Sequence, residues 1–156
     1  MSRRGSVDKR ELIADPKYHS LLLAKFINML MKDGKKALAE NIVYGALAKA
    51  ESQLQLNGLE IFDKAVENVK PAVELCYRRV GGATYPVPIE ARPIRSRSLA
   101  LRWLLFAARQ RARKPMRIKL YEELVDAYSN RGGAVKKREE NHKMTEANKA
   151  FAHFRW

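Results

Sequence analysis

The sequence has one cysteine and no long apolar run, and each shortage excludes a class of protein. Cys76 alone cannot form an intramolecular disulfide, and no second cysteine or nearby histidine pair completes a zinc site. The longest apolar segment, residues 21–31, is interrupted by Lys25 and Asn28, which leaves no stretch long enough to span a bilayer. We therefore expect an intracellular protein that is not embedded in a membrane.

Motifs that carry catalysis are also missing. The chain contains no GxSxG, GxGxxG, HExxH or CxxC pattern. Its three histidines, His19, His142 and His153, lie in different segments without metal-ligand spacing, so we interpret them as surface or packing residues. The sequence therefore predicts a protein that is not an enzyme and that requires no cofactor or metal.

Acidic residues are scarce: 17 Asp and Glu stand against 31 Lys and Arg, for a net charge of +14. An apolar content of 46% is too high for a disordered basic tail, and 156 residues are enough for one hydrophobic core but not comfortably for two. Fourteen excess charges on one small domain repel each other unless a polyanion neutralises them. Nucleic acid and an anionic membrane are the two obvious candidates.

Apolar spacing predicts a mainly α protein with a single domain, residues 1–156. Ser20 and Asn57 are expected to cap two of the helices, and Pro115 is expected to be the first residue of another. On the second helix, Leu38 and Ile42 begin the face that we expect to be buried, while the helix after Pro93 is apolar around most of its circumference and should be central. The six expected helices cover about residues 20–31, 35–52, 57–70, 93–110, 115–129 and 134–150.

Residues 72–90 have the alternating pattern of a two-stranded β-hairpin. Gly81 and Gly82 can both take the positive φ that a tight turn requires, which pairs Val80 with Ala83. The same register sets Tyr77 opposite Pro86 and Leu75 opposite Pro88, where the missing N–H groups do not break the ribbon. We expect the hairpin to protrude from the helical body, although a hairpin flattened onto the helices is also compatible with the pattern.

The two ends of the chain have no apolar periodicity of their own. Residues 1–19 are predicted to form an extended basic arm, and acids at positions 8, 11 and 15 argue against an import presequence. Residues 134–156 are predicted to form a charged helix followed by an aromatic tail. We expect the arm and the tail to become ordered only on binding a partner.

The excess charge gathers in residues 91–120, which contain ten basic residues and no acid. Within this segment Arg95, Arg102, Arg109 and Arg113 recur at helical spacing and fall in a sector about 40° wide, which predicts a basic stripe. A merely solvated helix face is the alternative, but solubility requires no such segregation. The ten residues are Arg92, Arg95, Arg97, Arg102, Arg109, Arg111, Arg113, Lys114, Arg117 and Lys119.

Three shorter basic groups supplement the stripe. Lys35 and Lys36 follow Gly34 at a helix start, where free backbone N–H groups could hold a phosphate, or where two lysines simply flank a turn. Arg78 and Arg79 lie on opposite faces of the predicted ribbon. They could contact nucleic acid, or they could be ordinary charges that protect a strand edge. Residues 136–138 are two lysines and an arginine followed by two glutamates, which fits a solvated helix face equally well.

Several ordered motifs resemble one family. They are Asp33–Lys36, Val66–Pro71, Arg78–Gly82, Leu99–Trp103, Ala134–Glu139 with Met144, and Glu146–Trp156. Together they closely resemble bacterial-type small-subunit ribosomal protein seven over nearly the whole chain. Two positions depart from the family pattern: Phe154 replaces an expected Tyr, and Thr145 an expected Ala.

The resemblance implies a six-helix body with a protruding hairpin and a basic N-terminal arm. It also implies binding to the 3′ major domain of 16S ribosomal RNA, initiation of assembly of the subunit head, and residence in ribosomes of the cytoplasm or of a plastid stroma. Expected partners are neighbouring ribosomal proteins, including one across the cleft between head and platform, and transiently exit-site tRNA and messenger RNA. A DNA-bending protein is the alternative, but it would need an apolar wedge at the hairpin tip, where Gly81 and Gly82 supply none.

The family's roles fall on particular residues of this sequence. The residues expected to contact ribosomal RNA are Arg3, Arg4, Lys9, Arg10, Lys35, Lys36, Arg78, Arg79, Arg92, Arg95, Arg97, Arg102, Arg109, Arg111, Arg113, Lys114, Lys136, Lys137 and Arg138. The residues expected near tRNA are Val80, Gly81, Gly82, Ala83 and Trp156.

Overall fold

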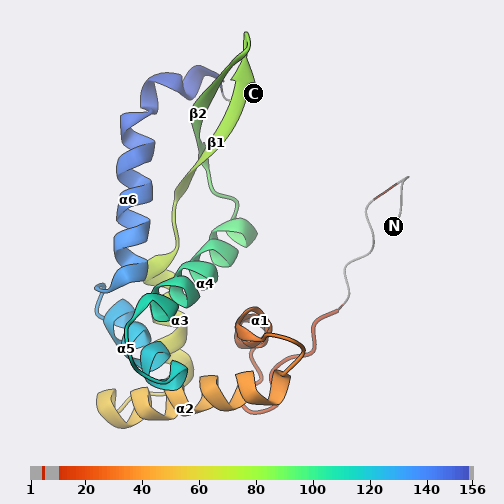
Figure 1. Ribbon diagram of the computed structural model, residues 1–156, viewed down its shortest axis with the longest axis vertical. Helices are drawn as coiled ribbons and strands as arrows, with labels where there is room; N and C mark the ends of the chain where they lie inside the picture. The colour runs from red at the N-terminus through yellow and green to blue at the C-terminus, as the bar shows by residue number, and fades with distance from the viewer. Residues whose placement is uncertain (1–4, 6–10, 155–156) are drawn as a thin grey trace.

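A computed structural model describes residue 5 and residues 11–154, which form a bundle of helices from which a hairpin extends (Figure 1). The elements in chain order are α1 (Leu21–Leu30), α2 (Lys36–Leu54), α3 (Gly58–Val69), β1 (Val73–Val80), β2 (Ala83–Glu90), α4 (Pro93–Gln110), α5 (Met116–Tyr128), α6 (Gly133–Ala147) and a 3₁₀ helix, η1 (Lys149–Phe154). The mainly α architecture with one hairpin, expected from the sequence, is confirmed.

Local signals set most helix ends. The Ser20 hydroxyl accepts a hydrogen bond from the backbone N–H of Leu23 at 3.3 Å, and the Asn57 side chain accepts one from Leu59 at 2.9 Å, so both predicted caps are confirmed. Pro115 lies one position outside α5 as its N-cap, so the prediction that it is the first helical residue is wrong by one. Its missing N–H costs nothing at either position.

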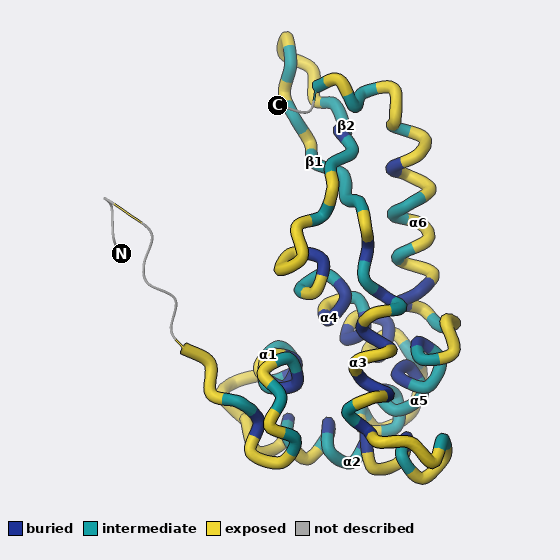
Figure 2. The backbone as a smooth tube through the Cα atoms, turned by 180° about the vertical axis from the view of Figure 1, so that it is seen from behind, coloured by how far each residue is buried: buried dark blue, intermediate teal, exposed yellow. Residues whose placement is uncertain are grey.

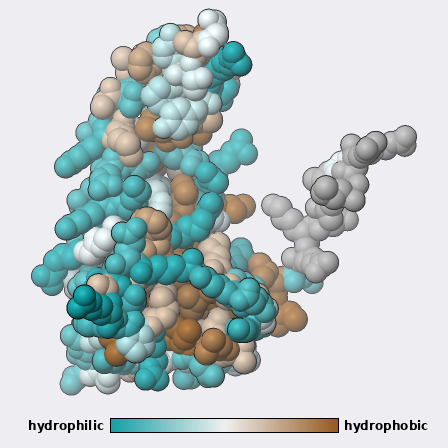
Figure 3. All heavy atoms as spheres, in the orientation of Figure 1, coloured by the Kyte–Doolittle hydropathy of each residue, from teal (hydrophilic) through white to brown (hydrophobic). Residues whose placement is uncertain are grey.

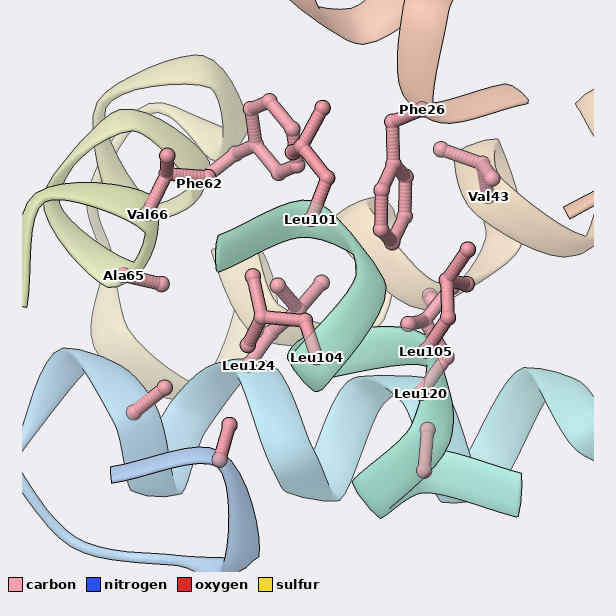
Figure 4. Close-up of a cluster of buried hydrophobic side chains, with 14 of the residues drawn as sticks. Phe26, Val43, Phe62, Ala65, Val66, Leu101, Leu104, Leu105, Leu120 and Leu124 are labelled. Carbon is pink, nitrogen blue, oxygen red and sulfur yellow. The ribbon is translucent and has the colours of Figure 1, made fainter. Parts of the chain in front are cut away.

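The core forms where α4 crosses the other helices. Leu101 and Leu104 of α4 are fully buried or nearly so, and Figure 4 shows them in one cluster with Phe62 of α3 and Phe26 of α1. The two phenyl rings lie 5.2 Å apart at their centroids, a favourable tilted contact. The expectation that the helix after Pro93 is central is thus confirmed.

Two expectations about burial are wrong in part. Leu38 is 57% exposed, and Ala39 takes its place on the buried face of α2. On α4, Phe106 is 55% exposed, and Trp103 is only half-buried. The neighbouring helices do not cover α4 on all sides. The face that includes Phe106 remains open to solvent, so some of the apolar residues around α4 are exposed.

The hairpin extends from the body and is braced along one face. Its register pairs Val80 with Ala83 and Tyr77 with Pro86 as predicted, and Gly81 and Gly82 have φ values of +58° and +89°. Figures 1 and 2 show α6 running beside the hairpin up to the level of η1. Val87 is fully buried on the covered face, whereas Tyr77 on the other face is 71% exposed. The hairpin therefore protrudes, as expected, but it is supported on one side.

The C-terminal segment is folded, contrary to the prediction for the tail. The charged helix ends at Ala147 rather than near residue 150, and η1 then turns across the hairpin. The rings of Phe151 and Phe154 lie 5.1 Å and 5.6 Å from the ring of Tyr85 on β2. Aromatic packing therefore orders residues 149–154 without a partner, a long-range contact that apolar periodicity does not reveal.

The end of the predicted N-terminal arm is also fixed to the body. Asp15 is 3% exposed and accepts hydrogen bonds from the Tyr44 hydroxyl at 2.6 Å and from the backbone N–H of Tyr18 at 2.9 Å. The interpretation of all of residues 1–19 as an extended arm is therefore wrong for residues 15–19. Most of the arm's cations, Arg3, Arg4, Lys9 and Arg10, lie outside the described residues.

Candidate nucleic-acid interface

The predicted basic stripe exists on α4 over its helical length. Arg95, Arg102 and Arg109 are all exposed, and so are Arg92 at the N-cap and Arg97 in the second turn. Arg95 forms an ion pair with Glu74 of β1 at 3.1 Å. For the other four, no carboxylate partner occurs among residue 5 and residues 11–154. The Arg102 Nε donates to the backbone carbonyl of Ser98 at 3.2 Å, and the terminal nitrogens of the four guanidinium groups can contact an external anion.

Arg113 does not belong to the stripe. Helix α4 ends at Gln110, and Arg113 has a φ of +50° in the connection to α5, so extending the helical arithmetic to residue 113 was wrong. The side chain is exposed, but its position is set by the loop rather than by the face of α4.

Arg111 is used inside the protein. Its guanidinium lies 2.7 Å from the carboxylate of Glu123 and 3.5 Å from that of Glu122, and it also pairs with Asp126. Burial alone would lower the pKa of Arg111, but hydrogen bonds to Asp126 and Glu123 outweigh it, and the net effect is a raised pKa. The acid-free segment thus receives its counter-charges from α5, which sequence proximity could not indicate.

Lys114 is drawn into the same acidic group. Its ammonium pairs with Glu122, and that hydrogen bond is the main reason why the pKa of Glu122 is lowered. The Lys114 side chain stays 52% exposed, so this pair is a surface contact. Arg111 and Lys114 are consequently less available for RNA than the arginines of α4.

The hairpin separates its two arginines as predicted. Arg79 is exposed, whereas Arg78 is half-buried and lies on the same face as Tyr85, whose ring contacts η1. The Arg78 Nε is buried without a hydrogen-bond partner in the described part of the chain. The tip residues Val80, Gly81, Gly82 and Ala83 form the far end of the ribbon, with all but the half-buried Val80 exposed.

The helix start at Lys35 and Lys36 differs from the predicted phosphate site. Both side chains are exposed, but the backbone N–H of Lys35 donates to Lys32 at 3.0 Å, and that of Lys36 donates to Gly34 at 2.8 Å. The expectation of free N–H groups at these two residues is therefore wrong, because the turn before α2 uses them. At Lys35 and Lys36 themselves, the side-chain charges remain to contact an anion.

The basic group on α6 divides between surface and structure. Lys136 is exposed, and Lys137 pairs with Glu140 at 3.3 Å on the helix surface. Arg138 instead donates to the backbone carbonyl of Asn68, which ties α6 to α3. Trp156, expected near tRNA, lies outside the described residues.

Sequence reasoning missed Phe106 as a residue of this surface, having placed it among the apolar residues of a buried helix. It follows Arg102 by four positions and precedes Arg109 by three, so helical arithmetic places it about 20° beyond the edge of the basic stripe. Figure 3 shows apolar atoms reaching the surface on the face that contains α1 and α4, surrounded by a mostly hydrophilic surface. An exposed ring among arginines is typical of nucleic-acid interfaces.

Nothing in the described part of the chain resembles a catalytic centre. Residues 5 and 11–154 contain no group of His, Cys, Asp and Glu arranged to hold a metal ion, and none of their helices is long and apolar enough to cross a membrane. Exposed arginines on a rigid helical body define the class: a structural protein that assembles with nucleic acid.

Comparison with known proteins identifies the family. The family model described as ribosomal protein S7p/S5e matches residues 2–149. Small ribosomal subunit protein uS7 of Methylococcus capsulatus is 58% identical over 156 residues, and the uS7 proteins of Thioalkalivibrio sulfidiphilus and Thermodesulfovibrio yellowstonii are each 55% identical, with full coverage of both chains in every case. The chain belongs to the ribosomal protein S7p/S5e family, with a structural and non-enzymatic role in the small ribosomal subunit.

Proposed function

We propose that this protein binds the 3′ major domain of 16S ribosomal RNA and initiates assembly of the head of the small subunit. The observation that carries the proposal is the set of exposed arginines on α4, because Arg102 and Arg109 of the stripe, and Arg97 on another face of the helix, have no carboxylate partner among the described residues. Each such side chain can neutralise a phosphate and release counterions, which makes RNA folding and protein binding mutually favourable.

The rigid body explains how several RNA helices could be held at once. Helix α4 packs against α1, α3, α5 and α6, so its cations are fixed relative to those of α6 and of the hairpin. Specificity then comes from the shape of the RNA and its 2′-hydroxyl groups, since side chains cannot read the narrow major groove of A-form RNA. A protein of this kind assembles its RNA by presenting charges at fixed spacings.

The hairpin is proposed to lie near exit-site tRNA and the path by which messenger RNA leaves. Its tip carries Gly81 and Gly82, which let a backbone approach closely, and exposed Arg79 lies two residues before the turn. A neighbouring ribosomal protein across the cleft between head and platform is the expected protein partner. The ribosomes concerned are those of the cytoplasm or of a plastid stroma.

A competition experiment tests the proposal. The full chain is bound to a fragment of the 16S ribosomal RNA head domain, with duplex DNA and duplex RNA of equal length as competitors, at several salt concentrations. Preferential binding of the head fragment that persists at moderate salt is the expected result. Equal affinity for the fragment and for either duplex would contradict the proposal and would favour a nonspecific or DNA-bending protein.

A further inference from the structure

An apolar hollow of about 620 Å³ lies on the open face of α4, between α1 and α6. Leu99, Trp103 and Phe106 supply apolar walls, and none of the residues that line the hollow is acidic. Three cations border it: Arg102 and Arg109 of α4 and Lys137 of α6. The hollow therefore combines aromatic surface with positive charge.

The Phe106 ring has no structural role that would explain its position. It is 55% exposed and stacks on no other ring in the described part of the chain. Arg102 and Arg109 lie one helical turn before and after it. Together with Leu99 and Trp103, the ring forms a contiguous apolar patch between cations, and such patches mark binding surfaces.

A second hollow adjoins the first at Arg109. It measures about 400 Å³ and is lined by Met31 and by Leu38, whose 57% exposure is otherwise unexplained. The second hollow also has Asp33 and two lysines in its lining, and Arg109 borders both hollows. A single nucleic-acid strand has the matching alternation, a phosphate between two bases.

We propose that the hollow at Phe106 holds an unpaired RNA base, with the adjoining phosphates at Arg102 and Arg109. The inference rests on the proposed function, in which the partner is RNA, and specifies that part of this RNA is unpaired. Bases inside a duplex are stacked on each other and cannot offer a face to Phe106, whereas a base in a loop or bulge can. An acidic protein segment is disfavoured, because an apolar wall of this size between three cations suits a planar heterocycle joined to phosphate.

Tryptophan fluorescence provides a direct readout. The chain has two tryptophans, so Trp156→Phe leaves Trp103 as the only reporter, and Trp103 lines the hollow. The probes are an RNA strand of about twelve nucleotides of mixed A and C, which cannot pair with itself, and the same strand annealed to its complement. We expect saturable quenching by the single strand and little quenching by the duplex.

Variants in the Trp156→Phe background then test the ring. Phe106→Leu should weaken binding of the single strand about tenfold, because a lost stacking contact has that effect, while Phe106→Tyr should bind as the parent does. Ile94→Ala, which removes another exposed apolar side chain of α4 outside the hollow, is the matched control and should change nothing. Equal quenching by strand and duplex, no quenching by either, or parental affinity in Phe106→Leu would overturn the inference.

The two proposals fail in different ways. If the protein binds the head fragment selectively and Phe106→Leu has no effect, only the proposal that the hollow holds a base is contradicted. If binding of the single strand depends on Phe106 but the protein shows no preference for the head fragment, only the proposal that it binds the 16S ribosomal RNA head domain is contradicted. Circular dichroism of each variant establishes that the fold is intact, and Phe106→Tyr gives a second comparison in which the ring is kept.

Discussion

The guanidinium of Arg111 lies 2.7 Å from the carboxylate of Glu123, a side chain that is only 1% exposed. The same carboxylate accepts a hydrogen bond from the backbone N–H of Ala134 at 2.9 Å, at the start of α6. Arg111 ends α4 and Glu123 belongs to α5, so one buried carboxylate joins three helices. This contact is one of those that hold the start of α6, the helix that braces the hairpin.

Removing Arg111 should therefore destabilise the fold. Arg111→Met leaves the buried Glu123 carboxylate without its counter-charge, and we expect the free energy of unfolding to fall by about 3 kcal/mol. Lys114→Met is the control, because its pair with Glu122 is a surface contact and should change the free energy by less than about 1 kcal/mol. Urea unfolding measures both. Equal losses in the two variants would show that Glu123 is not a structural centre.

The partly buried hydrogen bond from Tyr44 to Asp15 predicts a loss of stability at alkaline pH. Burial, followed by the hydrogen bond to Asp15, raises the pKa of Tyr44 well above the ordinary value of 10.0. Because the pKa of Tyr44 is higher in the folded state than in the unfolded state, the protonated hydroxyl contributes its full stabilisation at any pH below the unfolded-state pKa. This contribution declines as the pH rises above about 10. Absorbance of tyrosinate combined with unfolding at each pH tests this dependence.

Tyr44→Phe should remove that contribution and lower the free energy of unfolding at neutral pH by about 2 kcal/mol, since the lost bond has a charged acceptor. Tyr77→Phe, at an exposed position on the hairpin, should have almost no effect. If Tyr44→Phe retains the alkaline decline of the parent, the Asp15 contact is not its cause.

The contact of η1 with β2 predicts that the C-terminal segment protects the hairpin. Phe151→Ala removes a ring 5.1 Å from that of Tyr85, and we expect faster amide exchange throughout residues 73–90 with little change in the helices. Tyr77→Ala removes an aromatic ring from the uncovered face and should leave exchange nearly unchanged. Similar exchange in the parent and in Phe151→Ala would show that the tail does not brace the hairpin.

Local patterns were sufficient to predict much of this fold. Ser20 and Asn57 cap helices through their own neighbours, and Gly81 with Gly82 fixes the register of the whole hairpin through the positive φ values that a tight turn requires. Such features depend on a few adjacent residues, so the sequence displays them directly.

Features that depend on distant partners were not predictable in the same way. The acid-free segment did indicate a basic surface, but not that Glu122, Glu123 and Asp126 from the following helix neutralise Arg111. The order of η1 depends on Tyr85, more than sixty residues earlier in the chain. Phe106 could have been found, because its spacing from Arg102 and Arg109 places it beside the basic sector, but an apolar residue beside leucines resembles a core position.

The salt dependence of binding tests the central claim most directly. Arg97, Arg102 and Arg109 are changed together to Gln, and the affinity for the ribosomal RNA head fragment is measured over a range of salt concentrations. In the matched control, Lys64, Arg131 and Lys143 are changed to Gln. These three exposed cations lie outside the proposed interface, and the control variant has the same net charge as the α4 variant. We predict that the α4 variant flattens the slope of log affinity against log salt by about two to three, and that the control leaves it nearly unchanged. Equal slopes for the parent and the α4 variant would contradict the account.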